Sequence, residues 1–411
     1  MFNLLLSNSA ARSFVALYAG TLMSGTWAMI IPTIPELGRE FGVSAGGAAQ
    51  IVTATAIGKF FGTVAAGIML DRMGTRVALV GGPVAGCIAA LSCAVVPWFP
   101  LMLVLSLCIG AADSLGATAR EFAAIDLARR NQRGRLISSM HGTHNIGAAI
   151  APFVGGWLTE LFSFKAAFVG YAMSCALTAI LGAVGPNTAA PVAANETSES
   201  VRGWGATALR QRVRGLLVLF REIPPDLRAT FVALVLATLV SQSQRIIVQS
   251  MLPLYAGTYL NLSPSQIGML FTISGVIVFA MIIPAGLLMD HVGRKWCTVP
   301  STGAPALVFL LIPLTDSFMQ LALLVGIAGV AQGLSLGSLA TSTYDVVPSH
   351  ARGRLQAARR TIAELGSGVA PLIGGYLADQ FNPGVPFLVY APLLIFSAAF
   401  LALVGRETLG R

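Results

Sequence analysis

Runs of about twenty apolar residues recur about twelve times along this chain, and they limit its possible folds more than any other feature. A helix of about twenty residues crosses the ~30 Å hydrocarbon core of a bilayer. Inside hydrocarbon, a backbone satisfies its N–H and C=O groups only as a helix or a closed barrel. The runs are continuously apolar instead of alternating, and only 10% of all residues are charged. The sequence therefore predicts an all-α integral membrane protein.

We place twelve membrane-spanning helices on these runs. Their predicted ranges are 13–34, 48–70, 77–96, 100–124, 137–160, 166–185, 229–256, 266–289, 297–314, 318–341, 357–378 and 386–404. The loops alternate in basic content, and one side of the membrane keeps little beyond Arg39 and Lys165. Because basic residues collect in cytoplasmic loops, this alternation places both termini in the cytoplasm and favours the cytoplasmic (inner) membrane. The net charge of +9 follows from this topology and predicts no nucleic-acid partner.

A polar segment over residues 186–227 divides the chain. We expect an N-terminal six-helix bundle over 1–185, a cytoplasmic linker, and a C-terminal six-helix bundle over 228–411. The halves repeat one another at a constant offset of 219 residues, as from Gly67 to Gly286. Both copies of the basic loop fall on the cytoplasmic side, so each half contains an even number of crossings. Parallel repeats of this kind place a binding site between the halves near mid-membrane.

The segment between the second and third predicted helices carries a motif that occurs twice. Its first copy is Gly67, Asp71, Arg72, Gly74 and Arg76, and its second is Gly286, Asp290, Gly293, Arg294 and Lys295. The motif resembles the signature of the major facilitator superfamily, in its drug and metabolite efflux-like branch. The resemblance implies a cytoplasmic gate, in which Asp71 meets the positive end of a helix. Arg76 is expected to bridge to Asp126, whose repeat counterpart is Asp345.

Small residues in the fifth predicted helix and in its repeat are expected to let helices pack closely. They are Gly147, Pro152, Gly155, Gly156, Gly366, Pro371, Gly374 and Gly375. The first copy resembles the antiporter motif of the same superfamily, which favours export. Ala151 stands where that motif has Gly, and Ser106 stands where the fourth helix often has Arg. These departures argue against the drug:proton antiporter group but not against the superfamily, whose likeness covers essentially the whole chain.

Charges that occur in only one half are our candidates for the substrate and proton site. A charge at mid-membrane costs at least ~2.5–3.5 kcal/mol, so it should face an interior cavity and have a partner. Lys59 in the second predicted helix stands where the other half has Val278. Arg245 in the seventh stands where the first half has Thr26. Two deep cations favour an anionic or zwitterionic substrate, and Asp113 can neutralise either cation or bind the coupled proton.

The predicted translocation site consists of Lys59, Asp113, Arg245, Gln242, Gln249, Glu364, Trp27 and Gln332. Ion pairing within the protein is the alternative role for its charged members, and ordinary helix packing is the alternative for Trp27 and Gln332. Glu364 is a proton-site candidate unless it pairs with Arg360, four residues earlier.

Four other polar residues receive structural assignments. Arg120 and Glu121 lie towards the cytoplasmic end of the fourth predicted helix and are assigned to the gate network. His141 and His144 begin the fifth helix, where we expect helix packing or interhelical hydrogen bonds.

The leading interpretation is proton-coupled export of a small organic solute, which the two deep cations suggest is anionic. One alternative is proton-coupled uptake of an organic anion by symport. Another, of a different class, is a non-transporting membrane sensor or scaffold. An enzyme is the least favoured class, because Gly58-Lys59-Phe60 lacks the glycine loop and Ser/Thr of a phosphate site and no catalytic or metal constellation is present. We expect a monomer that contacts membrane lipid, uses protons as its coupling ion and needs no cofactor.

Overall fold

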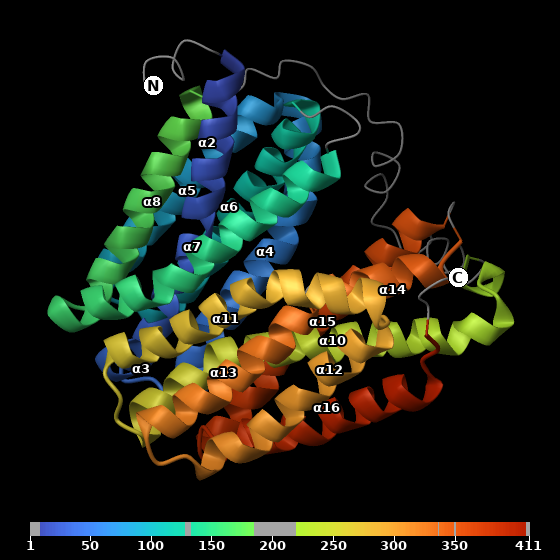
Figure 1. Ribbon diagram of the computed structural model, residues 1–411. Helices are drawn as coiled ribbons and strands as arrows, with labels where there is room; N and C mark the ends of the chain where they lie inside the picture. Colours follow the sequence, from blue (N-terminus) through green and yellow to red (C-terminus); the bar gives the residue numbers. More distant parts are fainter. Residues whose placement is uncertain (1–8, 128–132, 185–218, 336, 349–350, 408–411) are drawn as a thin grey trace, which may run out of the picture. The chain divides into compact units, whose positions relative to one another are not determined.

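The computed structural model describes residues 9–127, 133–184, 219–335, 337–348 and 351–407 (Figure 1). These ranges contain helices and no strand, as the sequence predicts. The chain divides into two compact units, each described by itself below. Unit 1 comprises Met1–Arg202 and Asn261–Gly275, and unit 2 comprises Gly203–Leu260 and Val276–Arg411.

Unit 1 is built from helices that run alongside one another (Figure 1). They are α2 (Ser9–Ser24), η1 (Gly25–Thr33), α3 (Ile34–Glu40), α4 (Ala45–Met73), α5 (Thr75–Val95), α6 (Phe99–Leu127), α7 (Arg133–Leu161) and α8 (Phe164–Val184), with the first part of α11 (Pro264–His291). The first predicted helix is not regular throughout, because η1 is a tighter 3-10 segment. Helices α4, α6 and α7 have 29 residues each. At 1.5 Å per residue they are about 44 Å long, enough to cross a bilayer core.

Unit 2 has the same character. Its elements are α10 (Pro225–Leu254), a π-helical turn η3 (Tyr255–Tyr259), the second part of α11, α12 (Lys295–Leu311), η4 (Ile312–Leu314), α13 (Phe318–Ser335), α14 (Ser338–Val346), α15 (Arg352–Gln380) and α16 (Val385–Val404). The helix predicted over 318–341 is divided, because α13 ends at Ser335 and α14 begins at Ser338, although Phe318–Val346 together form one candidate membrane span. Between α13 and α14, Gly337 has a φ of 81°, a left-handed conformation that glycine adopts easily and a continuous helix does not contain.

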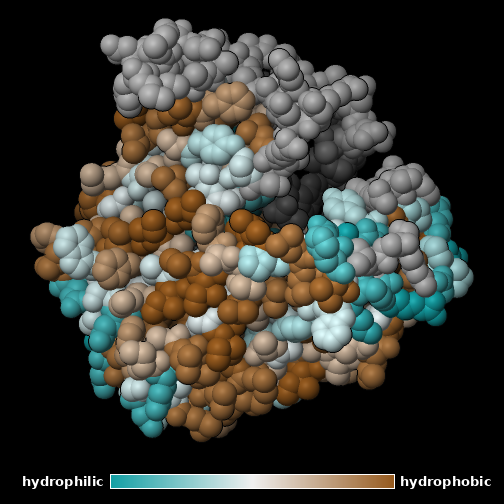
Figure 2. All heavy atoms as spheres, viewed as in Figure 1, coloured by the Kyte–Doolittle hydropathy of each residue, from teal (hydrophilic) through white to brown (hydrophobic). Residues whose placement is uncertain are grey.

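Nine stretches of the described chain are long and apolar enough to cross a membrane. Helices α4, α7 and α15, with 29 residues each, have the length as well. Many large apolar side chains are exposed, among them Val95, Ile283 and Leu403. Figure 2 shows apolar residues over the middle of the unit 2 helices and hydrophilic ones gathered towards their ends. Lipid would cover such a surface, whereas a soluble protein rarely exposes one.

The ends of α4 follow from its sequence. Ser44 precedes the helix, and its hydroxyl accepts a hydrogen bond from the Gly47 N–H at 3.1 Å, which satisfies one free donor of the first turn. Gly74 ends the helix with a φ of 82°, a conformation that disfavours any residue with a Cβ. The glycine of the repeated motif therefore sets the turn from α4 into α5.

Glycines bring α4 and α6 into close contact. A Cβ on Gly58 would lie 2.8 Å from the carbonyl carbon of Leu107, and one on Gly110 would lie 3.0 Å from the backbone nitrogen of Lys59. A Cβ on Gly62 would lie 2.6 Å from the Cα of Ala111. These distances are shorter than van der Waals contact, so only glycine permits this crossing.

The small residues of α7 lie where the helix meets other backbone. A Cβ on Gly147 would lie 3.1 Å from the carbonyl carbon of Leu22, and one on Gly155 would lie 2.5 Å from the Cα of Met29. Gly156 faces Pro264 in the same way, within unit 1.

The repeat of this motif in unit 2 packs mainly against side chains. A Cβ on Gly366 would lie 2.6 Å from the hydroxyl of Ser243, and one on Gly374 would lie 2.9 Å from Ile247. Both contacts are with α10, and Gly375 on α15 is also buried. The repeated glycines thus lie at helix crossings in both units.

Candidate functional site

An ion pair joins α4 to α6 at their glycine-lined crossing. The ammonium Nζ of Lys59 lies 3.1 Å from Oδ2 of Asp113. The Lys59 side chain is 43% exposed and that of Asp113 is 11% exposed, so the pair has one accessible and one buried member. One helical turn away, the hydroxyls of Thr63 and Ser114 lie 2.6 Å apart across the same crossing. The structure therefore brings together two of the predicted site residues, and Asp113 neutralises Lys59.

Trp27 joins the same cluster from η1. Its indole ring is 8% exposed, and the Lys59 ammonium lies 4.8 Å from the ring centroid. A cation over the face of an indole ring is stabilised by about 0.5–2 kcal/mol, depending on how far it is desolvated. Lys59 is thus held from two sides, by a carboxylate and by an aromatic face.

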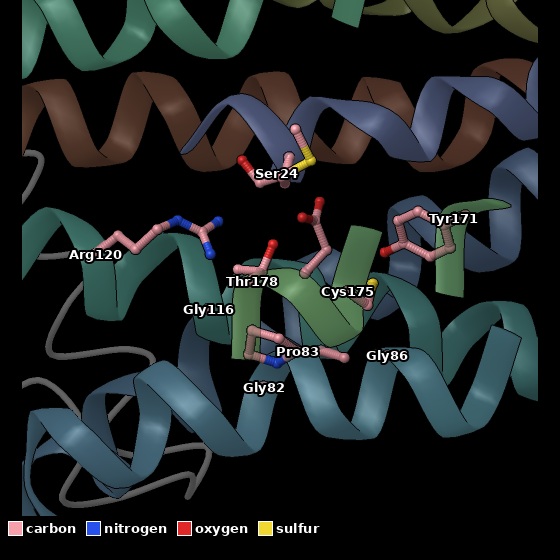
Figure 3. Close-up of a pocket in the computed structure, with 12 residues that line it drawn as sticks. Ser24, Gly82, Pro83, Gly86, Gly116, Arg120, Tyr171, Cys175 and Thr178 are labelled. Atoms are coloured by element: carbon pink, nitrogen blue, oxygen red, sulfur yellow. The ribbon is translucent and has the colours of Figure 1, made fainter. Parts of the chain in front are cut away.

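Arg120, which is expected to belong to the gate network, lies among buried residues, and its role in gating stays a prediction. Its side chain is only 5% exposed. Together with Asp113, Tyr171 and Thr178 it lines a cavity of about 290 Å³, a volume that includes space open to solvent. Figure 3 shows Arg120 from α6, Ser24 from α2 and Tyr171 and Thr178 from α8 around this cavity. A partial signal was available from the spacing, because Arg120 shares a helical face with Asp113.

Two histidines line a second cavity, whose volume of about 540 Å³ includes space open to solvent. It is lined by Thr21, Ser24, Ala117, Arg120, Glu121, Met140, His141 and His144. Nδ1 of His144 lies 3.1 Å from the hydroxyl of Ser24, a hydrogen bond between α7 and α2. The expected interhelical hydrogen bond is therefore present, and the structure adds that both rings border space shared with Arg120.

Arg245 in unit 2 has a different environment from Lys59. Its Nη2 donates a hydrogen bond to the hydroxyl of Ser335 on α13 at 3.1 Å, and that hydroxyl donates in turn to the carbonyl of Gln332 at 2.8 Å. Within the described residues, no carboxylate lies within ion-pair distance of Arg245. The predicted neighbours Gln242 and Gln249 are half-buried on the same helix. Arg245 is therefore a deep cation that has a hydroxyl partner but no counter-charge in the part of the chain that is described.

Glu364 on α15 is half-buried, and the described residues provide no hydrogen-bond donor to its carboxylate. The side chain of Arg360, its predicted partner, lies outside the residues that the structure describes. On the same helix Arg359 donates a hydrogen bond to the hydroxyl of Thr238 at 2.7 Å. The polar face of α10 thus meets a cation that sequence reasoning did not select.

The first copy of the gate motif is described only in part. Gly67 and the side chains of Asp71, Arg72 and Asp126 lie outside the described residues, so the expected bridge from Arg76 to Asp126 stays a prediction. Nη2 of Arg76 donates a hydrogen bond to the carbonyl of Ala183 at 3.0 Å, at the end of α8.

The second copy forms an ion-pair network in unit 2. Arg294 contacts Asp290 through Nη1 at 3.0 Å and Asp345 through Nε at 3.2 Å. All three residues were selected from the repeat, and one arginine joins the two acids. The end of α11 is thereby connected to α14 across the start of α12.

Two residues near the C-terminal end of the described chain make contacts that sequence reasoning missed, and one of them extends this network. The carboxylate of Glu407 accepts hydrogen bonds from the backbone N–H groups of Arg294 at 2.8 Å and Lys295 at 3.1 Å. It therefore satisfies free donors at the start of α12. Arg406 pairs with Asp226 at 3.1 Å. The only available signal was a pair of opposite charges directly after the last apolar run.

No group of three His, Cys, Asp or Glu residues among the described side chains is arranged to hold a metal ion.

Comparison with known families gives a match over nearly the whole chain. The sequence profile described as Major Facilitator Superfamily matches residues 16–234 and again residues 234–410. The multidrug resistance protein MdtG of Enterobacter lignolyticus is 21% identical over 410 residues, which cover 97% of this chain and 93% of that protein. An uncharacterized MFS-type transporter of Methanocaldococcus jannaschii is 22% identical over 282 residues, which cover 68% of this chain and 66% of that protein.

Solved structures share the fold. A D-xylose-proton symporter superposes with a TM-score of 0.74 at 17% identity and covers 98% of this chain and 100% of its own. A POT family transporter in complex with 5-aminolevulinic acid has a TM-score of 0.75 at 14% identity, covering 95% of this chain and 96% of its own. Together with the twofold profile match, these structures confirm the predicted twelve-helix fold of two six-helix bundles related by a parallel repeat.

Proposed function

Because the chain belongs to the Major Facilitator Superfamily, whose members carry out secondary transport by alternating access, we propose that it exports a small organic anion in exchange for protons. The charge of the solute is inferred from the residues described above. Export is supported by the antiporter-like residues of α7 and by the relative named a multidrug resistance protein. We place the protein in the cytoplasmic membrane as a monomer, with both termini in the cytoplasm.

The observation that carries the anionic substrate class is the contrast between the two deep cations. Lys59 is neutralised by Asp113 at 3.1 Å, whereas Arg245 has only the hydroxyl of Ser335 as a described polar partner. A cation kept in a membrane protein without a counter-charge is costly, and such residues usually mark a substrate or ion pathway. An anionic group on the solute would provide the missing counter-charge.

The Lys59–Asp113 pair supports proton coupling. Protonation of Asp113 removes its negative charge and releases the Lys59 ammonium from the pair. The released ammonium is then available to an anion, so the proton and the solute influence each other through one contact. This geometry also favours a second candidate function, proton-coupled uptake by symport, because a proton on Asp113 would help an anion to bind.

Counterflow in proteoliposomes tests the substrate class. Each of a set of anionic, neutral and cationic compounds is trapped inside, and the entry of its labelled form is measured with and without a pH gradient. We expect anions to be exchanged, and Lys59→Ala and Arg245→Ala to abolish the exchange while both variants remain folded and inserted. Lys165→Ala, which removes an exposed lysine, serves as the matched control. Wild-type exchange in both site variants would remove these residues from the site.

The sign of proton movement separates the two candidate functions. A pH-sensitive dye inside the vesicles reports protons that enter or leave as the solute enters. Antiport makes the lumen more alkaline as solute enters, and symport makes it more acidic. The absence of flux for every compound, with folded protein, would favour the sensor or scaffold class instead.

The network of Asp290, Arg294 and Asp345 is proposed to act in gating, together with the first copy of the motif. Such a network should control the rate of exchange without contacting the solute. Asp345→Asn is therefore expected to change exchange rates equally for all transported compounds. A changed order of preference among the compounds would contradict this role.

A further inference from the structure

The side chain of Arg120 is buried inside unit 1, where it is 5% exposed. It extends from α6 alongside two glycines, Gly20 of α2 and Gly116 of α6. A Cβ on Gly20 would lie 3.5 Å from Cδ of Arg120, and a Cβ on Gly116 would lie 3.2 Å from its Nη1. The distance at Gly20 is ordinary van der Waals contact, whereas the distance at Gly116 is tighter, so a side chain at Gly116 would press on the guanidinium. The helices therefore accommodate a guanidinium at this depth.

The guanidinium makes neither a hydrogen bond nor an ion pair with the described residues, although it borders both cavities and interacts electrostatically with Asp113. Asp113 lines one of the cavities, but its carboxylate is already paired with Lys59 at 3.1 Å. Glu121 lines the other, and no ion pair joins it to Arg120. Since arginine remains charged at every physiological pH, a buried guanidinium in this state requires a counter-charge or water.

The surrounding groups fit an anion better than they fit a second cation. His144 uses Nδ1 towards Ser24 at 3.1 Å, and none of the described residues engages its Nε2. Arg120 shares with both histidines a cavity that opens to solvent, so a small ligand can reach the guanidinium. The single carboxylate of Glu121 at this cavity would oppose a second negative charge on the ligand. A monoanion is therefore favoured over a dianion.

We propose that Arg120 is the centre of a binding site for a small monocarboxylate within unit 1. The planar guanidinium offers two parallel N–H donors that match the two oxygens of a carboxylate. His144 and His141 border the space into which the rest of the ligand extends. The claim that the transported solute binds at this site rests on the proposed function. The claim that the site binds a carboxylate does not depend on transport.

Ligand-induced stabilisation of the purified full-length protein in detergent tests the site. Thermal unfolding is followed in the presence of acetate, hexanoate or benzoate, each compared with its neutral amide, and in the presence of inorganic phosphate. We expect at least one carboxylate to raise the unfolding temperature while its amide does not. Arg120→Gln should weaken the apparent affinity for that carboxylate at least about tenfold, as expected for the loss of a charge-assisted hydrogen bond. Arg120→Lys, which keeps the charge but loses the two parallel N–H donors of the guanidinium, should retain part of the affinity.

The variant without ligand provides a second measurement. Arg120→Gln removes a buried charge that has no described partner, so its unfolding temperature without ligand should equal or exceed that of the wild type. A structural ion pair would give the opposite result, and marked destabilisation of Arg120→Gln would therefore overturn the proposal. So would equal stabilisation of the wild type and Arg120→Gln, or no response of the wild type to any carboxylate. Stabilisation by phosphate alone would assign the position to a lipid-headgroup-like phosphate and also overturn it.

Failure of the proposed function and failure of the Arg120 site give different combinations of results for exchange and for carboxylate binding. Lys165→Gln is the matched control, and it should bind the carboxylate with wild-type affinity because Lys165 is exposed and lines neither cavity. If Arg245→Ala retains wild-type exchange while Arg120→Gln loses carboxylate binding, the anion-export proposal fails and the site stands. If exchange depends on Arg245 but Arg120→Gln binds normally, the site fails and the export proposal stands.

Discussion

Gly110→Ala is expected to separate α4 from α6 and to break the Lys59–Asp113 pair. The added Cβ would lie 2.9 Å from the carbonyl carbon of Thr55 and 3.0 Å from the backbone nitrogen of Lys59, and closer still to the Thr55 oxygen. All of these atoms belong to backbone, so no flexible side chain can move aside. To restore ordinary contact with the oxygen, the two helices must separate by more than about 1 Å.

The size of the effect follows from this displacement. One extra methyl group in a packed core costs about 1–3 kcal/mol, and this crossing has backbone on both sides. Because Asp113 is one turn further along α6, its distance from Lys59 grows with the separation from the present 3.1 Å. Alanine is a better helix former than glycine by about 1 kcal/mol, which offsets part of the cost. We expect a net destabilisation of about 1–2 kcal/mol and a larger loss of anion exchange.

Thermal unfolding of the purified variant measures the first effect, and counterflow in proteoliposomes measures the second. Gly142→Ala on α7 is the matched control, because no atom lies within 4 Å of a Cβ placed there. The control should be as stable as the wild type or more so, with wild-type exchange. Wild-type unfolding and exchange in Gly110→Ala would refute the argument that a glycine-dependent crossing holds the pair together.

Two further predictions concern charges. Lys59→Gln and Asp113→Asn each leave one charge unpaired, so the double variant should be more stable than the sum of the two single effects implies. We expect a coupling free energy of about 0.5–3 kcal/mol from a double-mutant cycle measured by thermal unfolding. Purely additive effects would contradict the ion pair. Glu407→Ala removes the acceptor for the Arg294 and Lys295 N–H groups and should lower the free energy of unfolding by about 0.5–2 kcal/mol. The control Glu40→Ala, at another exposed glutamate, should change stability little. Equal effects of the two substitutions would contradict the capping role of Glu407.

The membrane class, the helices and the repeat were predictable because each is a local or periodic property of the sequence. An apolar run of twenty residues predicts a span without any knowledge of its neighbours. The duplicated motif fixed which residues of unit 2 belong together, and Arg294 does meet Asp290 and Asp345. Because Lys59 occurs in only one half, it was predicted to lie in the site; Asp113 was expected to neutralise Lys59 or Arg245 or to bind a proton, and the structure pairs it with Lys59.

The features that sequence reasoning missed depend on long-range packing. Arg120 shares a helical face with Asp113, but Arg120 was placed in the gate network because it lies near the cytoplasmic end of the predicted helix. Its burial arises from α2 and α8, which the sequence of α6 does not contain. Glu407 reaches the start of α12 from 113 positions away in the chain, where no periodic pattern connects them. The break at Gly337 was missed because a single glycine inside an apolar run is compatible with a continuous helix.

The selection of anions by Arg245 is tested most directly by the ratio of the initial rate of carboxylate exchange to that of amide exchange. Exchange of a transported carboxylate and of its neutral amide is measured in proteoliposomes for the wild type and for Arg245→Gln. We expect carboxylate exchange to fall at least about tenfold in the variant while the slow amide exchange stays the same, since only the charged solute uses the guanidinium. An equal fall for both compounds, or wild-type carboxylate exchange in the variant, would show that the cation does not recognise the charge of the solute.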